Sequence, residues 1–123
     1  MSVEEADRNV ARNRSTLLEG GRPVPGQHIL DVINDGSIVG TLWLGHQPSQ
    51  IPNEWFIYDI VIDEASRGSG LGRATMLAAE EFVRARSGTR LALNVFGPNT
   101  IARRLYESLH YEVMSLSMYK DLA

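Results

Sequence analysis

Three glycines, Gly68, Gly70 and Gly72, alternate with other residues between Arg67 and Arg73 in the stretch "SRGSGLGRA". The stretch follows an apolar run and opens a segment with helical periodicity. A helix that starts after a glycine turn offers unpaired N–H groups and a partial positive charge, and glycine lets an anion approach the backbone. Arginine adds charge-assisted hydrogen bonds. The pattern therefore predicts a site for a phosphate-like anion.

The spacing excludes two common phosphate motifs. A P-loop needs G-x-x-x-x-G-K-[ST], and the stretch contains no lysine. The dinucleotide motif needs G-x-G-x-x-G, but its last position falls on Arg73 when counted from Gly68 and on Thr75 when counted from Gly70. The pattern R-x-x-G-x-G remains. An ordinary strand-to-helix turn would also account for this loop taken alone.

The apolar periodicity predicts the elements that must position this loop. "NDG" at residues 34–36 indicates a tight hairpin, and Asn99 is placed to cap a helix. We expect helices over residues 3–18, 71–86 and 100–109, and strands over residues 28–35, 37–45, 55–63, 90–96 and 111–122. This order predicts a mixed α/β fold, and the length of 123 residues suits a single domain over 1–123.

The loop resembles the pyrophosphate loop [QR]-x-x-G-x-[GA] of the GNAT family of N-acetyltransferases. Ile62 lies five positions before the arginine, where that family carries an apolar residue. A second stretch, "LNVFGPNTIARRLYESLHYEV", resembles the family's later strand, asparagine turn, helix and closing strand. The resemblance is strong from Trp55 to the C-terminus and weak before it. It implies a GNAT-like acyl-CoA N-acyltransferase fold (α+β, mixed sheet), with acetyl-CoA as donor and a primary amine of a small molecule or peptide as acceptor.

The resemblance also implies how the donor is bound. The loop holds the CoA pyrophosphate, the backbone of the preceding strand holds the pantetheine arm, and a strand N–H polarises the thioester carbonyl. Asn99 would both cap its helix and contact the arm. The implied cofactor-binding residues are Ile60, Val61, Ile62, Arg67, Gly68, Ser69, Gly70, Gly72, Arg73, Asn99 and Tyr106.

Tyr106 lies where the family places a tyrosine general acid. A leaving thiolate needs only a modest proton donor because a thiol has a pKa of about 8.5. The other interpretation is that Tyr106 is a core residue of an amphipathic helix.

The attacking amine must lose protons, and a carboxylate is the usual acceptor. Asp59 is the charged residue inside an otherwise apolar strand, so it either lines a site as general base or is a solvated strand residue. Glu54 is the alternative base and, with Asn94, a candidate for the acceptor side. The chain has no cysteine, so we expect direct attack in a ternary complex rather than an acyl-cysteine intermediate.

Composition narrows the function classes. Twelve Lys and Arg against 15 Asp and Glu give a net charge of −3, which argues against a nucleic-acid partner. Without cysteine, and with His28, His46 and His110 scattered, no metal site is expected. No apolar run is long enough for a membrane span or a signal peptide, so we expect a cytoplasmic protein without membrane contact.

Two departures from the family pattern stand out. His110 replaces the glycine that usually precedes the aromatic residue after the last helix, and the family's first strand and helix are apparently lacking before residues 3–18. An acceptor site without them would be open, reduced or completed by another subunit, and an unpaired edge strand favours a homodimer. An acyl-CoA-binding module without transfer is therefore the alternative function. A toxin-like acetyltransferase of aminoacyl-tRNA is a third, against which the acidic balance argues.

Overall fold

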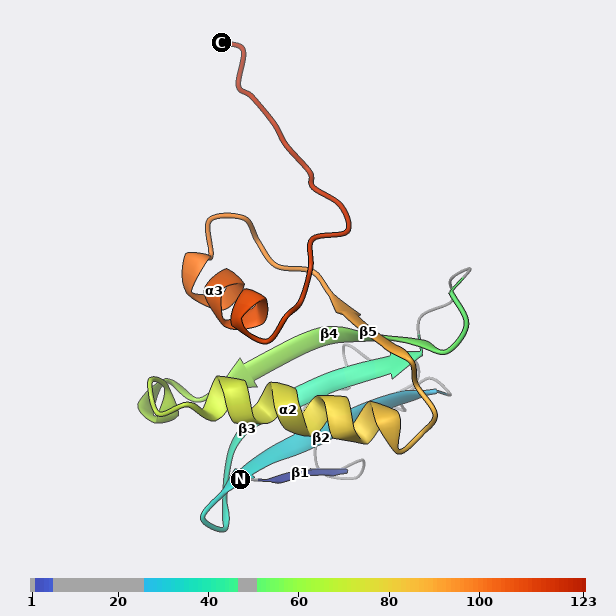
Figure 1. Cartoon of the computed structure of the whole chain (residues 1–123). Helices are drawn as coiled ribbons and strands as arrows, with labels where there is room; N and C mark the ends of the chain where they lie inside the picture. Colours follow the sequence, from blue (N-terminus) through green and yellow to red (C-terminus); the bar gives the residue numbers. More distant parts are fainter. Residues whose placement is uncertain (1, 6–25, 47–50) are drawn as a thin grey trace, which may run out of the picture.

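The computed structural model describes residues 2–5, 26–46 and 51–123, which form one five-stranded sheet and the helices beside it (Figure 1). The strands follow the order β1-β2-β3-β4-β5; neighbours are antiparallel except β4 and β5, which are parallel. Helix α2 crosses one face of the sheet, and α3 lies beyond β4 (Figure 1). The elements are β1 (Ser2–Glu5), β2 (Gln27–Asn34), β3 (Ser37–His46), β4 (Glu54–Ile62), the 3₁₀ turn η3 (Glu64–Ser66), α2 (Leu71–Arg84), β5 (Arg90–Leu93) and α3 (Thr100–Ser108).

The core lies between the sheet and α2. Apolar residues that alternate along β2, β3 and β4 face residues spaced by three and four along α2, as the two periodicities require. Neither helix in the described ranges has the length and apolar character that a membrane crossing needs. The buried cluster consists of Leu30, Val32, Leu42, Leu44, Trp55, Ile57, Met76, Ala79 and Val83.

The predicted hairpin is confirmed. Asp35 and Gly36, with φ of 51° and 78°, form the two-residue turn between β2 and β3. The predicted mixed α/β sheet, the strand over β4 and both described helices are also confirmed. His110 adopts φ of 71° after α3, so it takes the left-handed conformation that glycine usually provides at a helix end.

A β-bulge interrupts the pairing of β3 with β4. Trp43 lies opposite Asp59 while Leu44 lies opposite Ile57, so the register passes over Tyr58. An extra residue of this kind bends the strand and increases its twist. The bulge occurs where the parallel pairing of β4 with β5 ends, at Ile57 opposite Leu93. Beyond this point β4 and β5 diverge.

The helix predicted over residues 3–18 is wrong at its start. Ser2–Glu5 form β1, with Val3 opposite Val32 of β2, and the rest of that range lies outside the described residues. A strand therefore does precede the hairpin, and the β2 edge that we expected to be unpaired is paired. Four residues are too few to distinguish the side-chain period of a strand, 2.0, from that of a helix, 3.6. The strand with which they pair lies far away in the sequence, so it cannot be inferred from these residues.

The strand predicted over residues 111–122 is also wrong, since the described chain has no strand after α3. It instead leaves the sheet as an extended tail (Figure 1). The predicted strand at residues 90–96 is likewise shorter, because β5 ends at Leu93. In both cases the alternating sequence is present, but no neighbouring strand in the described chain supplies hydrogen bonds.

Candidate functional site

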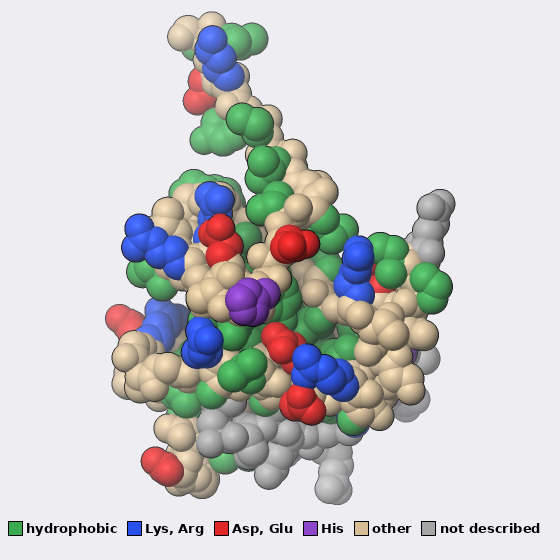
Figure 2. All heavy atoms as spheres, in the orientation of Figure 1, with side chains coloured by type: hydrophobic (Ala, Val, Ile, Leu, Met, Phe, Trp, Pro, Cys, Tyr) green, Lys and Arg blue, Asp and Glu red, His purple; other side chains and the backbone are tan. Residues whose placement is uncertain are grey.

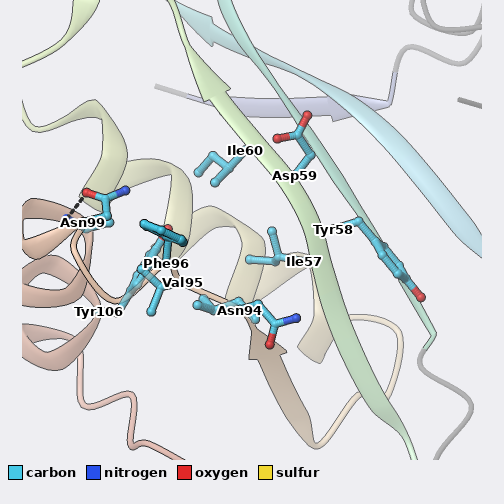
Figure 3. A pocket seen from close by; sticks show the side chains of 11 residues that line it. Ile57, Tyr58, Asp59, Ile60, Asn94, Val95, Phe96, Asn99 and Tyr106 are labelled. Carbon is cyan, nitrogen blue, oxygen red and sulfur yellow. Dashed lines mark hydrogen bonds between the residues drawn. The ribbon is translucent and has the colours of Figure 1, made fainter. Parts of the chain in front are cut away.

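A pocket of about 220 Å³ opens where β4 and β5 diverge (Figure 3). Its floor comes from the bulged part of β4, its wall from the segment after β5, and its far side from the start and first turns of α3. Ligand sites of open α/β sheets form at the carboxyl ends of parallel strands. The lining residues are Ile57, Tyr58, Asp59, Ile60, Leu93, Asn94, Val95, Phe96, Asn99, Ala102 and Tyr106.

The divergence leaves one edge of β4 available to a ligand. Residues 60–62 pair with β3 on one side, but β5 pairs only with residues 54–57 on the other. On that second side, no described strand lies next to residues 60–62. Because unpaired backbone groups are costly when buried, this edge suits a ligand that can take the place of a strand.

The glycine loop lies directly after β4 and ends at the N-terminus of α2. Gly68 and Gly70 have φ of 81° and 80°, a conformation that side chains rarely adopt. Apart from each glycine and its chain neighbours, no atom of the described residues lies within 4 Å of the position a Cβ would take there. Gly70 is the N-cap of α2, and no side chain caps this helix. The first-turn N–H groups are therefore left without a side-chain cap, as an anion site requires.

Arg67 and Ser69 stabilise the loop. The Arg67 Nε donates to the carbonyl of Ile62 at 3.0 Å, which ties the loop to the end of β4. The Ser69 hydroxyl donates to the Ser66 carbonyl at 2.8 Å. The terminal nitrogens of Arg67 make no hydrogen bond with a described residue, so the side chain can position the loop and still bind an anion.

Gly72 and Arg73 have an evident packing role. A Cβ at Gly72 would lie 3.3 Å from the Leu105 side chain, so glycine lets α3 approach the first turn of α2. The Arg73 guanidinium donates to the Ser108 hydroxyl at 3.0 Å. Both residues thus hold the two helices together, which the sequence motif did not reveal.

Tyr106 and Asn99 line the pocket from α3. The Asn99 side chain accepts a hydrogen bond from the Ala102 N–H at 3.3 Å, so the predicted cap is confirmed (Figure 3). The Tyr106 hydroxyl makes no hydrogen bond with a described residue, and burial raises its pKa above the ordinary 10.0. Tyr106 therefore keeps its proton at neutral pH and can donate it.

The structure brings Asp59, Ile60 and Asn94 into the same pocket but separates Glu54 from them. Glu54 lies at the opposite end of β4, six residues and roughly 20 Å from Ile60. Its side chain is 5% exposed, with a carboxylate oxygen 3.9 Å from Arg90.

Val61 and Ile62 also lie outside the pocket lining, although the Ile62 carbonyl binds Arg67. Sequence reasoning missed the lining residues Ile57, Tyr58, Leu93, Val95, Phe96 and Ala102. The signal that could have found most of them was their place around the carboxyl ends of two strands joined by a helix, a connection typical of parallel strands.

Within residues 2–5, 26–46 and 51–123, no three His, Cys, Asp or Glu side chains come together as metal ligands. The site is built from backbone groups, arginines, amides, the Asp59 carboxylate and a tyrosine. Such a set can bind a phosphorylated ligand at the loop and donate a proton in the pocket.

The fold is shared with solved acetyltransferase structures. Residues 4–111 match the model of the Acetyltransferase (GNAT) family, so the chain belongs to this family. Enzymes of this family use acetyl-CoA.

The relatives agree with this assignment. The uncharacterized N-acetyltransferase YycN of Bacillus subtilis is 34% identical over 107 residues, which cover 86% of this chain and 69% of YycN. The YycN crystal structure superposes with a TM-score of 0.79 at 32% identity, covering 91% of this chain and 72% of that one.

Two further matches concern acetyltransferases with described ligands or acceptors. Mycothiol acetyltransferase of Beutenbergia cavernae is 40% identical over 73 residues, which cover 59% of this chain and 24% of that protein. The structure of AAC(6')-Iy, solved in complex with a CoA bisubstrate analog, shares the fold with a TM-score of 0.73 at 12% identity, covering 99% of this chain and 97% of that one.

Proposed function

We propose that this chain transfers an acetyl group from acetyl-CoA to a primary amine of a small molecule or peptide. The observation that carries the proposal is that β4 lines the pocket at Ile57–Ile60 and leads directly into the glycine loop, whose helix N-terminus at Gly70 has no side-chain cap. Arg67 ties this loop to the end of β4 through its bond to Ile62. A ligand with an anionic group, a slender arm and a reactive end would place these three parts at the loop, along β4 and in the pocket.

The loop is proposed to bind the pyrophosphate. The N–H groups of the first turn of α2 point at an anion without an intervening side chain, because Gly68 and Gly70 leave that space open. Arg67 adds charge-assisted bonds through its terminal nitrogens. Gly72 and Arg73 are proposed to contribute their backbone N–H groups, since their other contacts are with α3.

The unpaired edge of β4 is proposed to hold the amide-bearing pantetheine arm. Peptide groups of Ile60 can bond the arm as a strand would, and Asn99 faces it from α3. The pocket volume of about 220 Å³ is below the roughly 300–1,000 Å³ of pockets that enclose a whole drug-sized ligand. It suits an acyl group and the end of a slender arm.

Tyr106 is proposed as the general acid. Asp59 is proposed to accept the first proton of the ammonium form of the acceptor, which frees the amine for attack. The amine nitrogen then forms a bond to the thioester carbonyl carbon, the carbon–sulfur bond breaks, and the Tyr106 hydroxyl donates its proton to the leaving sulfur. The new amide nitrogen gives up its remaining extra proton through solvent to the Tyr106 phenolate, which restores the hydroxyl. Asn94, on the other side of the pocket, is proposed to orient the acceptor.

A cationic, polar amine is the acceptor class that these residues favour. Asp59 provides a carboxylate beside the pocket, and the similar proteins include enzymes named for aminoglycoside and mycothiol acetylation. The alternative of a binding module without transfer rested on a missing first strand. The presence of β1 removes that argument.

The test is turnover of acetyl-CoA by the purified chain with a panel of amines that includes an aminoglycoside, an amino sugar, a polyamine and a lysine peptide. We expect thiol release with at least one cationic amine, reduced strongly in Asp59→Asn. Tight acetyl-CoA binding without turnover of any amine would favour the binding module. An unchanged rate in Asp59→Asn would remove Asp59 as the base.

A further inference from the structure

The hydroxyl of Tyr106 has no hydrogen bond of its own within the described part of the chain, so its direction depends on what holds the ring. Tyr106 lies in the last turn of α3, at the wall of the pocket. A proton donor must be held close to the reacting atom, because a displacement of about 1 Å can cost roughly 100-fold in rate. The contacts around this ring therefore matter for the proposed chemistry.

The end of α3 is a Schellman motif that includes Tyr106. The Tyr111 N–H donates to the Tyr106 carbonyl at 3.0 Å, and the His110 N–H donates to the Glu107 carbonyl at 3.0 Å. These two bonds define this type of helix end. The motif needs a residue in the left-handed conformation, which His110 supplies with φ of 71°. It brings Tyr111 back beside Tyr106.

The two tyrosine side chains repeat the link that the backbone makes. Their rings meet edge to face, with 6.0 Å between the centroids and 63° between the planes. This arrangement is favourable because the positive edge of one ring meets the negative face of the other. Both side chains also pack against the hydrophobic core. Packing of this kind leaves the Tyr106 ring few other rotamers.

Glu80 of α2 fixes the far end of Tyr111. The Tyr111 hydroxyl donates to the Glu80 carboxylate at 2.9 Å, and the Glu80 side chain is 20% exposed. A hydrogen bond to an ionised acceptor is stronger than one between neutral groups. Because α2 packs on the sheet through its core residues, this bond connects Tyr111 to the most rigid part of the fold.

Arg84 is the other neighbour of Glu80 and allows the two contacts to be separated. Its guanidinium lies 3.6 Å from a Glu80 carboxylate oxygen, and its side chain is 62% exposed. Figure 2 shows acidic and basic side chains mixed over the face along which α2 runs. An exposed ion pair of this kind contributes little to stability. Loss of Arg84 should therefore leave the bond between Glu80 and Tyr111 in place.

We propose that Glu80 and Tyr111 are positioning residues for the proton donor: Glu80 holds Tyr111, and Tyr111 holds the Tyr106 ring so that its hydroxyl points at the leaving sulfur. This rests on the proposed role of Tyr106 as general acid. Glu80 and Tyr111 are not among the described residues that line the pocket, so both act through the Tyr106 ring.

Ring mobility tests the positioning itself and needs no substrate. NMR relaxation of protein labelled at tyrosine gives the order parameter of the Tyr106 ring, whose signal is identified by its loss in Tyr106→Phe. We expect a rigid ring in the wild type and in Glu80→Gln, which keeps an oxygen acceptor. The order parameter should fall in Glu80→Leu and in Tyr111→Leu.

The matched control for ring mobility is Arg84→Gln, which removes the ion pair of Glu80 and should leave the ring rigid. Circular dichroism shows which variants stay folded, and Glu80→Leu keeps the test open if Tyr111→Leu does not fold. An equal order parameter of Tyr106 in the wild type and in folded Glu80→Leu would overturn the proposal.

Kinetics in two backgrounds test the consequence for catalysis, with acetyl-CoA and the amine of the panel above that reacts fastest. We expect Glu80→Leu to lower kcat about tenfold with an unchanged acetyl-CoA dissociation constant. In the background of Tyr106→Phe, which has no proton to direct, Glu80→Leu should have no further effect. A loss of folded enzyme would instead lower kcat by the same factor in both backgrounds, and that result would overturn the proposal.

The same kinetics distinguish failure of this inference from failure of the proposed function. A low kcat in Tyr106→Phe together with full kcat in Glu80→Leu would overturn the positioning role and leave the general acid in place. An unchanged kcat in Tyr106→Phe would overturn the general acid, and the positioning role with it.

Discussion

The hydroxyl of Tyr111 donates a hydrogen bond to the carboxylate of Glu80 at 2.9 Å, and its ring contacts that of Tyr106 edge to face at 6.0 Å between centroids. The first contact joins the segment after α3 to α2. The second places Tyr111 against the proposed general acid. One side chain therefore links the core helix to the pocket wall.

Removing this bond should destabilise the fold. We expect Tyr111→Phe to lower the free energy of unfolding by about 1 kcal/mol, because it keeps the ring and deletes one hydrogen bond to a half-buried carboxylate. Urea unfolding measures the change. Tyr119→Phe is the control because Tyr119 is 89% exposed. Equal losses in the two variants would show that the Glu80 bond contributes nothing specific.

Stability should fall in alkaline solution. Burial raises the pKa of Tyr106 and Tyr111 above 10.0, and for Tyr111 the bond to Glu80 raises it further. The unfolded chain then loses these protons at a lower pH than the folded chain. The contribution is present in full below pH 10.0 and is lost as pH rises toward the folded pKa values. Melting temperature measured from about pH 8 to about pH 11, which spans the ordinary tyrosine pKa of about 10, should decline less steeply in Tyr111→Phe than in wild type; parallel profiles would contradict this.

Tyr106→Phe separates acid catalysis from packing. The variant keeps the ring in the pocket and removes the proton donor, so we expect kcat to fall by about 10²-fold or more while the acetyl-CoA dissociation constant changes little. Steady-state kinetics and calorimetry measure the two effects. Tyr58→Phe is the control, because Figure 3 shows its ring directed away from Tyr106. Weaker acetyl-CoA binding with an unchanged kcat would make Tyr106 a binding contact instead.

Asn99 combines two roles that substitution can separate. Asn99→Ala should cost about 1 kcal/mol of stability through loss of the α3 cap, whereas Asn99→Asp keeps an acceptor for the Ala102 N–H. If the amide N–H₂ of Asn99 also binds the pantetheine arm, Asn99→Asp should restore the melting temperature but leave acetyl-CoA affinity reduced. Recovery of both quantities in Asn99→Asp would limit Asn99 to capping.

Short-range sequence patterns predicted the elements whose structure depends on residues close together in the sequence. The turn at Asp35 and Gly36 and the cap at Asn99 follow from short-range geometry, and the amphipathic α2 follows from its own period. β1 and the tail could not be predicted correctly, because a strand exists only with a partner elsewhere in space. The alternation of residues 111–122 identified a strand-forming sequence but not its missing neighbour.

The residues of the candidate site could likewise be predicted from the sequence only in part. The motif identified the glycine loop, and apolar strands made the polar residues Asp59 and Asn94 stand out; both line the pocket. Glu54, the alternative base, lies at the start of β4 and does not line the pocket. The contact of Gly72 with Leu105 required the three-dimensional packing of two helices.

Calorimetry of acetyl-CoA binding tests the central claim most directly, with Gly70→Ala and Gly36→Ala beside the wild type. Both glycines have positive φ, 80° and 78°, and open space around the Cβ position, so the two substitutions impose similar backbone strain. Only Gly70 lies at the proposed pyrophosphate site. We predict binding by the wild type, a loss of about tenfold or more in Gly70→Ala, equivalent to about 1.4 kcal/mol, and little change in Gly36→Ala. Absence of binding by folded wild-type protein, or equal affinity in Gly70→Ala, would contradict the assignment of this loop to the acyl donor.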